Sequence, residues 1–177
     1  MEKSSCSPNV TTYSTLISGF VKAGDLLGAS AIWNKMINCS CHPNVVVYTT
    51  MVDVLCQMSM FNQAHHLIEN IVADGCPLNL ATFNTLIKGL CVNRRIEKAM
   101  SVFHQMEKYE CLPNIRTYNE LLDGLFRVNR FREACGLIKD IEERNVKLNT
   151  VIYNIIMHEF SSTGCKNKFY KFCEKYW

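Results

Sequence analysis

The chain has 177 residues, of which 48% are hydrophobic and 20% charged, a composition that excludes a disordered protein and allows a core of its own. Nineteen basic and 16 acidic residues leave a net charge of +3, which permits nucleic-acid binding without demanding it. No apolar run approaches the roughly 18 residues needed to cross a bilayer, and the first residues, MEKSSCSPNV, contain neither a signal-peptide core nor an Arg-rich presequence. We therefore expect no membrane association.

A period of 35 residues runs through the chain. Its clearest marker is an aromatic column made of Tyr13, Tyr48, Phe83, Tyr118 and Tyr153. The same spacing relates the apolar residues Leu16, Met51, Leu86, Leu121 and Ile156, and the small residues Ala29, Ala64, Ala99 and Ala134. A glycine column holds Gly19, Gly89 and Gly124, with Val54 as its exception. A fixed period of this size predicts a stacked solenoid.

The period divides the chain into repeats in this order: residues 1–9 as the remnant of a preceding repeat or an N-terminal tail, then 10–44, 45–79, 80–114, 115–149, and a partial, degenerate repeat at 150–177. Each complete repeat predicts two helices of about 14 residues. In the third repeat one apolar face consists of Phe83, Leu86, Ile87, Leu90 and Cys91. After a turn at 92–95, a second face consists of Ile96, Ala99, Met100, Phe103 and Met106. The predicted fold is an all-α superhelical solenoid of stacked helix-turn-helix units.

The last repeat departs from the pattern. Residues 151–160 keep the first-helix pattern, whereas residues 161–177 lose the alanine column. Phe169, Phe172, Cys173 and Tyr176 still fit one helical face. Two interpretations stay open: a helix that caps the stack, or a truncated product.

Ten cysteines raise the question of disulfides. Cys41, Cys76 and Cys111 are spaced by 35 residues, as are Cys56 and Cys91, so they are copies of repeat positions. Equivalent positions of neighbouring repeats lie too far apart for a disulfide, and buried reduced thiols are the expected state. The stretch Cys39-Ser40-Cys41-His42 resembles half of a metal site, but no second half stands at ligand spacing, so we expect neither metal nor cofactor.

The stretch PNIRTYNELLDGLFRVNRFREACGLIKDIEERNV (113–146) resembles the pentatricopeptide repeat, whose typical phrase joins Pro-Asn or Pro-Asp, Thr-Tyr-Asn, Leu-Ile-x-Gly and a later Glu-Ala. The likeness extends over residues 8 to about 160 at constant repeat length, which is typical of the plain P class of plant-type members. The tetratricopeptide repeat fits worse in both period and motif. The resemblance implies a right-handed superhelix that reads single-stranded RNA, one base per repeat.

In this family two side chains read each base: the residue after the first-helix aromatic and the last residue of the same repeat. The resemblance therefore implies the pairs Ser14 with Asn44, Thr49 with Asn79, Asn84 with Asn114, and Asn119 with Asn149, followed by an unpaired Asn154. Under the family's recognition scheme, Ser or Thr with Asn favours adenine, and Asn with Asn favours a pyrimidine. The expected target is 5′-A-A-(C/U)-(C/U)-3′, with one more pyrimidine if Asn154 reads.

Two further columns follow from the resemblance. The residues expected to sandwich bases are Thr11, Val46, Ala81, Arg116 and Val151. The residues expected to contact phosphate near the end of the first helix are Lys22 and Arg127. The equivalent positions of the middle repeats hold Gln57 and Val92, which weakens the electrostatic contribution to RNA affinity.

Structural interpretations compete with these roles. Asn44, Asn79, Asn114 and Asn149 directly precede predicted helices, and Asn is a strong N-cap. The column of Asn84, Asn119 and Asn154 is less favourable within a helix, but it could reflect duplication of one ancestral repeat. The tyrosine column is expected in the core, and His65 and His66 on a second helix away from the readers.

The sequence shows no arrangement of nucleophile and base, no paired carboxylates and no phosphate-binding glycine loop, so we do not expect an enzyme. The resemblance implies an RNA-binding protein, expected as a monomer with protein partners unspecified. It further implies that this protein stabilises, processes or permits translation of a transcript in a mitochondrion or chloroplast, although no targeting peptide is visible in this sequence. The alternative is a helical-repeat scaffold that binds protein and whose RNA recognition has decayed.

Overall fold

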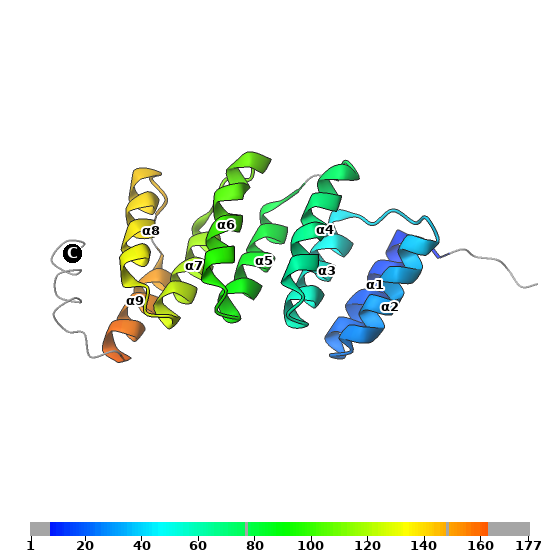
Figure 1. Ribbon diagram of the computed structural model, residues 1–177, viewed down its shortest axis with the longest axis horizontal. Helices are drawn as coiled ribbons and strands as arrows, with labels where there is room; N and C mark the ends of the chain where they lie inside the picture. Colours follow the sequence, from blue (N-terminus) through cyan, green and yellow to red (C-terminus); the bar gives the residue numbers. More distant parts are fainter. Residues whose placement is uncertain (1–7, 77, 148, 163–177) are drawn as a thin grey trace, which may run out of the picture. The chain divides into compact units, whose positions relative to one another are not determined.

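The computed structural model describes residues 8–76, 78–147 and 149–162, and the chain divides into two compact units, the first ending at Gly89 and the second beginning at Leu90. Within these described residues the chain contains α-helices, one 3-10 helix and no strand (Figure 1). The elements are α1 (Val10–Lys22), α2 (Leu26–Asn38), α3 (Val45–Gln57), α4 (Phe61–Ala73), α5 (Leu80–Val92), α6 (Ile96–Met106), η1 (Glu107–Tyr109), α7 (Ile115–Arg127), α8 (Phe131–Glu143) and α9 (Thr150–Ser162). The all-α class predicted from the 35-residue period is confirmed.

The first helices of successive repeats begin 35 residues apart, at Val10, Val45, Leu80, Ile115 and Thr150. In the first unit, α1 packs against α2 and α3, and α3 packs against α4. In the second unit, α7 packs against α6, α8 and α9 (Figure 1). Helices α3 and α7 thus lie between their hairpin partners and a neighbouring repeat, which explains why more of their residues are buried than in α4 and α8.

Residues with left-handed backbone end the helices, and they too recur every 35 residues. Turns within hairpins use Gly24, Ser59, Arg94 and Asn129, and turns between hairpins use Ser40, Gly75, Glu110 and Asn145. The backbone N–H of the next residue then donates to a carbonyl five residues back, as in Met60 N to Leu55 O at 2.8 Å. This Schellman-type closure satisfies carbonyls that the helix end leaves open, so every repeat turns in the same way.

The aromatic column lies in the core, as predicted, at Tyr13, Tyr48, Phe83 and Tyr118. The Tyr48 hydroxyl donates a hydrogen bond to Asp74, and the Tyr118 hydroxyl donates to Asp140 at 2.5 Å. Burial, together with these hydrogen bonds, raises the pKa of both tyrosines. Each hydroxyl therefore ties a first helix to the C-terminal end of its hairpin partner.

Glycine at one column allows neighbouring first helices to approach closely. A Cβ added at Gly89 would lie 2.5 Å from the Cβ of Cys56, and one added at Gly124 would lie 2.7 Å from the Cβ of Cys91. Both cysteines are buried free thiols, and burial raises the pKa of each to about 12. The expectation that the cysteines are buried is met only in part, because the seven described cysteines differ in burial: three are buried, three half-buried and Cys39 exposed.

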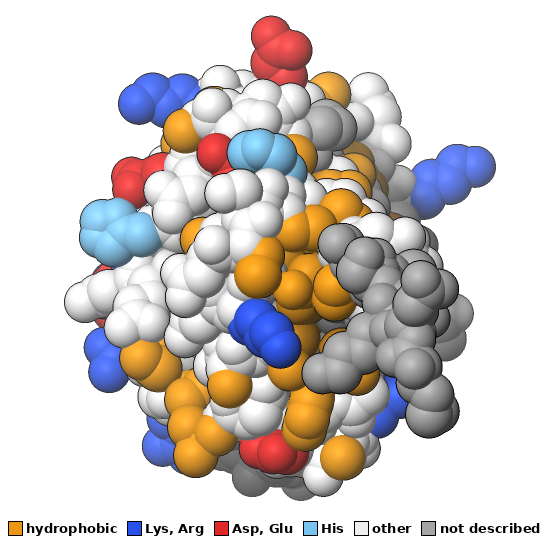
Figure 2. Space-filling model, turned by 90° about the vertical axis from the view of Figure 1, so that its right-hand side faces the viewer, with side chains coloured by type: hydrophobic (Ala, Val, Ile, Leu, Met, Phe, Trp, Pro, Cys, Tyr) orange, Lys and Arg blue, Asp and Glu red, His pale blue; other side chains and the backbone are white. Residues whose placement is uncertain are grey.

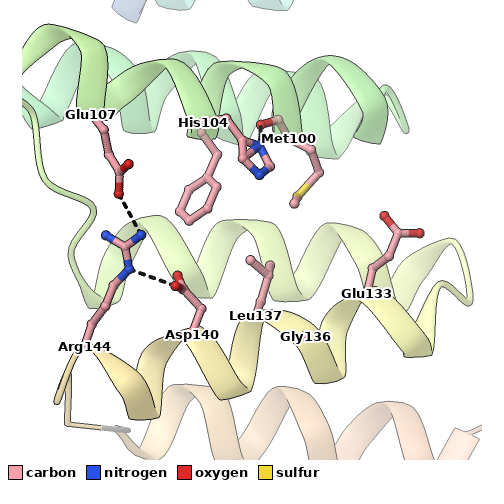
Figure 3. A pocket seen from close by; sticks show the side chains of 9 residues that line it. Met100, His104, Glu107, Glu133, Gly136, Leu137, Asp140 and Arg144 are labelled. Atoms are coloured by element: carbon pink, nitrogen blue, oxygen red, sulfur yellow. Dashed lines mark hydrogen bonds and ion pairs between the residues drawn. The ribbon is translucent and has the colours of Figure 1, made fainter.

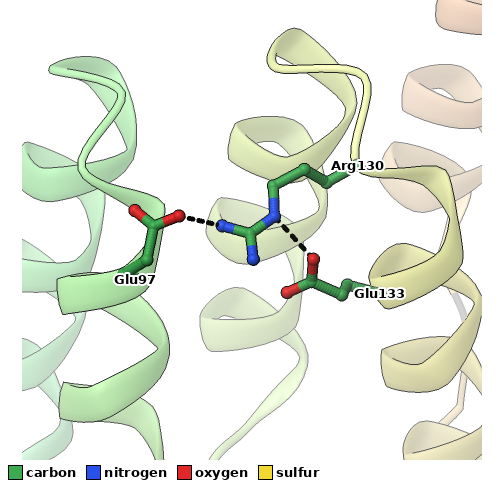
Figure 4. A network of polar contacts seen from close by, with 3 residues as sticks. All are labelled: Glu97, Arg130 and Glu133. Carbon is green, nitrogen blue, oxygen red and sulfur yellow. Dashed lines mark hydrogen bonds and ion pairs between the residues drawn. The ribbon is translucent and has the colours of Figure 1, made fainter.

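In the second unit, two arginines join the second helices α6 and α8 at both ends. Arg130, at the start of α8, pairs with Glu97 of α6 and with Glu133 at 2.5 Å (Figure 4). Arg144, directly after α8, contacts Glu107 at 2.6 Å and Asp140 at 2.8 Å (Figure 3). Burial opposes ionisation of Asp140, but the hydrogen bonds from Tyr118 and Arg144 outweigh it and hold its pKa below the ordinary value.

The first hairpin exposes apolar surface at its outer side. Figure 2 views the molecule from this end and shows hydrophobic side chains gathered on the face. Leu16 is 44% exposed, whereas its equivalents Met51, Leu86 and Leu121 are buried. The described residues place no hairpin on the outer side of α1, so a position that is core in the later repeats faces solvent here.

None of the described helices combines the length and the apolar character that crossing a membrane requires. The face predicted from Phe169, Phe172, Cys173 and Tyr176 lies outside the described residues.

Candidate nucleic-acid interface

Helix α3 keeps a narrow accessible stripe between buried faces. In α3, Val46 is exposed and Thr49 half-buried, whereas Val47, Tyr48 and Met51 are buried. Helical spacing brings residues three and four apart onto one face, so Val46 and Thr49 share this stripe. The stripe therefore combines an outward apolar side chain with a polar side chain one turn later.

All five residues expected to sandwich bases are exposed, and each is the second residue of its helix: Thr11, Val46, Ala81, Arg116 and Val151. Val46 is 57% exposed and Val151 49%. The next residue along the chain is buried in four of these helices. Two aliphatic side chains thus point outward where burial would otherwise be favourable, which suits contact with a planar apolar partner.

The asparagines that close the repeats all act as N-caps. Asn44 Oδ1 accepts the Val47 N–H at 3.0 Å, and Asn149 Oδ1 accepts the Ile152 N–H at 3.1 Å. Asn79 and Asn114 cap α5 and α7 in the same way. The capping role is confirmed. Within the part of the chain that the structure describes, these caps use Oδ1, which leaves the Nδ2 group of each side chain as a donor.

The second repeat brings its two predicted readers together through a third residue. Thr49 Oγ1 lies 2.7 Å from Thr82 Oγ1, and Thr82 Oγ1 donates to Asn79 Oδ1 at 3.1 Å. Thr82 is fully buried in the first turn of α5. Thr49 and Asn79, which are 30 residues apart in sequence, are therefore members of one hydrogen-bonded chain.

The other first readers lie in different environments. Ser14 is half-buried and Asn154 exposed, whereas Asn84 is only 5% exposed. Asn119 is half-buried, and its Oδ1 atom is buried without a hydrogen-bond partner. An acceptor in this state carries a desolvation cost that a bound donor would remove.

Thr82 and Thr117 are two further polar residues of this region, and they belong to none of the predicted reader, sandwich or phosphate columns. Both are fully buried, and Thr117 Oγ1 donates to Asn114 Oδ1 at 3.3 Å while accepting the Asn114 N–H at 3.2 Å. The pattern Asn-x-x-Thr, a variant of the capping box, marks both. That signal separates these repeats from Asn44 and Asn149, which are followed three residues later by Val47 and Ile152.

The predicted phosphate contacts are both exposed, but they differ in pairing. Lys22 lies in the last turn of α1. Arg127 Nε contacts Asp123 Oδ2 at 2.8 Å, and its side chain is 55% exposed. A phosphate near Arg127 would therefore compete with an exposed ion pair, which is a weak competitor.

A pocket of about 370 Å³ opens between α6 and α8, on the second helices (Figure 3). Phe103 and Leu137 form its apolar wall, while Arg144 and Asp140 close one end.

His65 and His66 lie on α4 beside Glu69, with the His66 Nδ1 atom 2.9 Å from Glu69 Oε2. Among the described residues no three His, Cys, Asp or Glu side chains converge where a metal ion could bind.

Comparison with solved structures finds repeat proteins of the same fold. The crystal structure of the pentatricopeptide repeat protein PPR10 from maize has a TM-score of 0.86 at 18% identity, covering 96% of this chain and 24% of that chain. PPR10 in complex with an 18-nt psaJ RNA element has a TM-score of 0.80 at 18% identity, covering 97% of this chain and 25% of that one. The chain therefore spans about a quarter of the length of PPR10.

A second relative is matched over most of its own length. The PPR domain of Arabidopsis thaliana protein-only RNase P 1, in complex with tRNA, has a TM-score of 0.72 at 15% identity, covering 89% of this chain and 83% of that chain. A search of curated proteins found no match.

A family model described as the PPR repeat family matches residues 8–57, 43–92, 79–127 and 113–162. These four overlapping stretches leave only the two ends of the chain unmatched. With the period, the helical hairpins and these matches in agreement, the chain belongs to the pentatricopeptide repeat family.

Proposed function

We propose that this chain binds single-stranded RNA, one base per repeat, through the accessible stripe of its first helices. The observation that carries the proposal is the exposed second position of every first helix, one turn before a polar reader position. An outward aliphatic side chain such as Val46 can pack on a base, and Thr49 beside it can bond the edge of that base. The bound RNAs of PPR10 and of the RNase P domain support the same class of ligand.

The proposed target is 5′-A-A-(C/U)-(C/U)-3′, from Ser14 with Asn44, Thr49 with Asn79, Asn84 with Asn114 and Asn119 with Asn149. Asn154 adds a further pyrimidine in this proposal. Hydroxyl and amide side chains suit this task because they supply both donors and acceptors to a Watson–Crick edge.

The proposed consequence of binding is occupancy of a site on a transcript in a mitochondrion or chloroplast, which protects it, directs its processing or permits its translation. The chain would act as a monomer, with no cofactor and without catalysing a reaction of its own. Lys22 and Arg127 would contribute the phosphate contacts, few enough to make the affinity less dependent on salt than in more basic RNA-binding proteins.

The proposal is tested by titrating the protein with a labelled oligonucleotide containing AACC and with a scrambled control at two salt concentrations. We expect the AACC sequence to bind about tenfold more tightly or better. Equal, weak binding of both sequences would contradict it and would favour a protein-binding scaffold.

A single substitution makes the test more specific. Asn79→Asp retains an N-cap, because Asp and Asn cap helices about equally well, but it replaces the Nδ2 donor by an acceptor. The preferred second base should therefore change from adenine to guanine, whose edge offers N–H donors, while the melting temperature changes little. A lower melting temperature with unchanged base preference would show that Asn79 is only a cap.

A further inference from the structure

The hydroxyl of Thr49 has its proton committed inside the protein. Thr49 Oγ1 lies 2.7 Å from the Val45 carbonyl oxygen, one helical turn before it, and 2.7 Å from Thr82 Oγ1. Thr82 Oγ1 in turn lies 3.1 Å from Asn79 Oδ1. Three contacts therefore share two hydroxyl protons.

Every possible arrangement of these protons leaves Thr49 without a proton to donate to a ligand. The contact with Val45 O can only be donated by Thr49, and the contact with Asn79 Oδ1 can only be donated by Thr82. The Thr49 proton is thus used either on Val45 or on Thr82. In both cases the oxygen of Thr49 offers only a lone pair to a ligand.

The amide of Asn79 has a fixed orientation for a related reason. Its Oδ1 atom accepts the Thr82 N–H at 3.0 Å and faces the Thr82 hydroxyl. An amide nitrogen cannot accept from an N–H group, so the carbonyl oxygen must face Thr82 and the Nδ2 group must face away. The second repeat therefore offers one acceptor, on Thr49, and one donor, on Asn79.

We propose that Thr82 is a positioning residue that sets this hydrogen-bond polarity, so that the second repeat selects a base with an amino group beside a ring acceptor, adenine among the purines. This inference rests on the proposed RNA-binding function. Adenine presents an amino donor and the acceptor N1, whereas guanine presents a carbonyl acceptor and an N1–H donor. The residue that discriminates between them comes from the following repeat and does not itself reach the base.

The first and fourth repeats lack the hydroxyl that Thr82 supplies to the second. The position 33 residues after Ser14 holds Val47, and the position 33 residues after Asn119 holds Ile152, both buried. Asn119 Oδ1 is the buried side-chain acceptor without a partner in the described part of the chain. Ser14 and Asn119 therefore have no hydroxyl at the position equivalent to Thr82 to hold them by a hydrogen bond.

The experiment compares Thr82→Val and Thr82→Ser with the unmodified chain. Binding is measured by fluorescence anisotropy to oligonucleotides with identical flanks that contain AACC, AGCC or GACC. Thr82→Val leaves the Val45 carbonyl as the single remaining internal partner of the Thr49 hydroxyl. Thr49 can then turn its proton towards a base at the cost of that one bond, and Asn79 Oδ1, which still accepts the N–H of residue 82, regains one lone pair, so guanine becomes acceptable. In Thr82→Val the preference for AACC over AGCC should fall about fivefold, while the preference for AACC over GACC should not change. Thr82→Ser keeps the hydroxyl and should retain both preferences of the unmodified chain.

Val47→Thr is the reciprocal variant, because it introduces the hydroxyl beside Ser14 with little change in volume. It should raise the preference for AACC over GACC by a similar factor and leave the second nucleotide unaffected. This gain keeps the inference falsifiable even if Thr82→Val does not fold.

The binding data distinguish failure of the proposed RNA-binding function from failure of the role assigned to Thr82. If the unmodified chain shows no base preference, the proposed function fails and the inference fails with it. If the unmodified chain prefers AACC but neither Thr82→Val nor Val47→Thr changes the ratio at its own nucleotide, RNA reading stands and the role of Thr82 is overturned.

Discussion

The reader pairs of the second and fourth repeats differ in how completely their polar atoms are satisfied. Thr49 and Asn79 are joined through the hydroxyl of Thr82, whereas Asn119 has a buried Oδ1 without a partner and Ile152 at the equivalent position. The surrounding helices are built alike. One buried residue, contributed by the next repeat, therefore decides whether the polar side chain at the predicted reader position has a hydrogen-bond partner within the protein.

First helices approach each other closely in both units, at Gly89 in the first and at Gly124 in the second. Gly89→Ala and Gly124→Ala should each lower the free energy of unfolding by about 2 kcal/mol, because the added Cβ would overlap Cys56 or Cys91. Urea denaturation measures the effect.

Gly136→Ala is the matched control for these variants. Gly136 lies within α8, and nothing stands within 4 Å of a Cβ added there. This variant should gain up to about 1 kcal/mol from helix propensity. Equal responses at Gly89, Gly124 and Gly136 would show that helix approach does not constrain the repeats.

The buried tyrosines test whether the same hydrogen bond, from a first helix to its hairpin partner, stabilises both units equally. Tyr48→Phe and Tyr118→Phe each remove a hydrogen bond to an aspartate and should each cost about 1 kcal/mol at neutral pH. Chemical denaturation of the two variants measures these costs. Unequal costs would locate a further difference between the units.

Acid extends the test at Tyr118. The pKa of Asp140 is lower in the folded protein than in the unfolded chain, so Asp140 stabilises the fold at neutral pH and this contribution is lost as the pH falls below about 4. The decrease in melting temperature between pH 7 and pH 3 should be smaller in Tyr118→Phe than in the unmodified chain. An unchanged pH profile would mean that Tyr118 does not influence the Asp140 carboxylate.

Two further substitutions, one in each predicted reader pair, should change stability with opposite signs, and the smaller effect is at Asn119. Asn119→Ala removes an unsatisfied acceptor and a poor helix former, so it should stabilise the chain by about 0.5 kcal/mol. Thr49→Val removes a satisfied hydroxyl and should destabilise it by about 1 kcal/mol. Thermal melts in the absence of RNA separate the two, and destabilisation by Asn119→Ala would reveal a partner for its side chain.

The sequence predicted the features that depend on the chain's own period. The aromatic column marks helices that begin at Val10, Val45 and Leu80, and the asparagines before them are caps because N-cap chemistry is local. Burial of Tyr118 follows from its place on the apolar face. These features need no knowledge of how one repeat sits on the next.

The features that could not be predicted depend on contacts between repeats. Thr49 meets Thr82 from 33 positions away, and Arg130 meets Glu97 at the same separation. Neither pair has a signature at helical spacing, whereas the ion pair of Arg127 with Asp123 is an ordinary i, i+4 contact. The burial of Asn84 likewise depends on packing that periodicity does not specify.

The close fit of Cys56 against Gly89 and of Cys91 against Gly124 also makes these thiols reporters of motion. With pKa values of about 12 and no space beside the sulfur, they react with an alkylating reagent only when neighbouring first helices separate. The labelling rate at each site is therefore a measure of local opening, one within each unit. A ligand that spans several repeats should slow labelling at both sites, so these two packing residues can report whether a bound ligand tightens the stack.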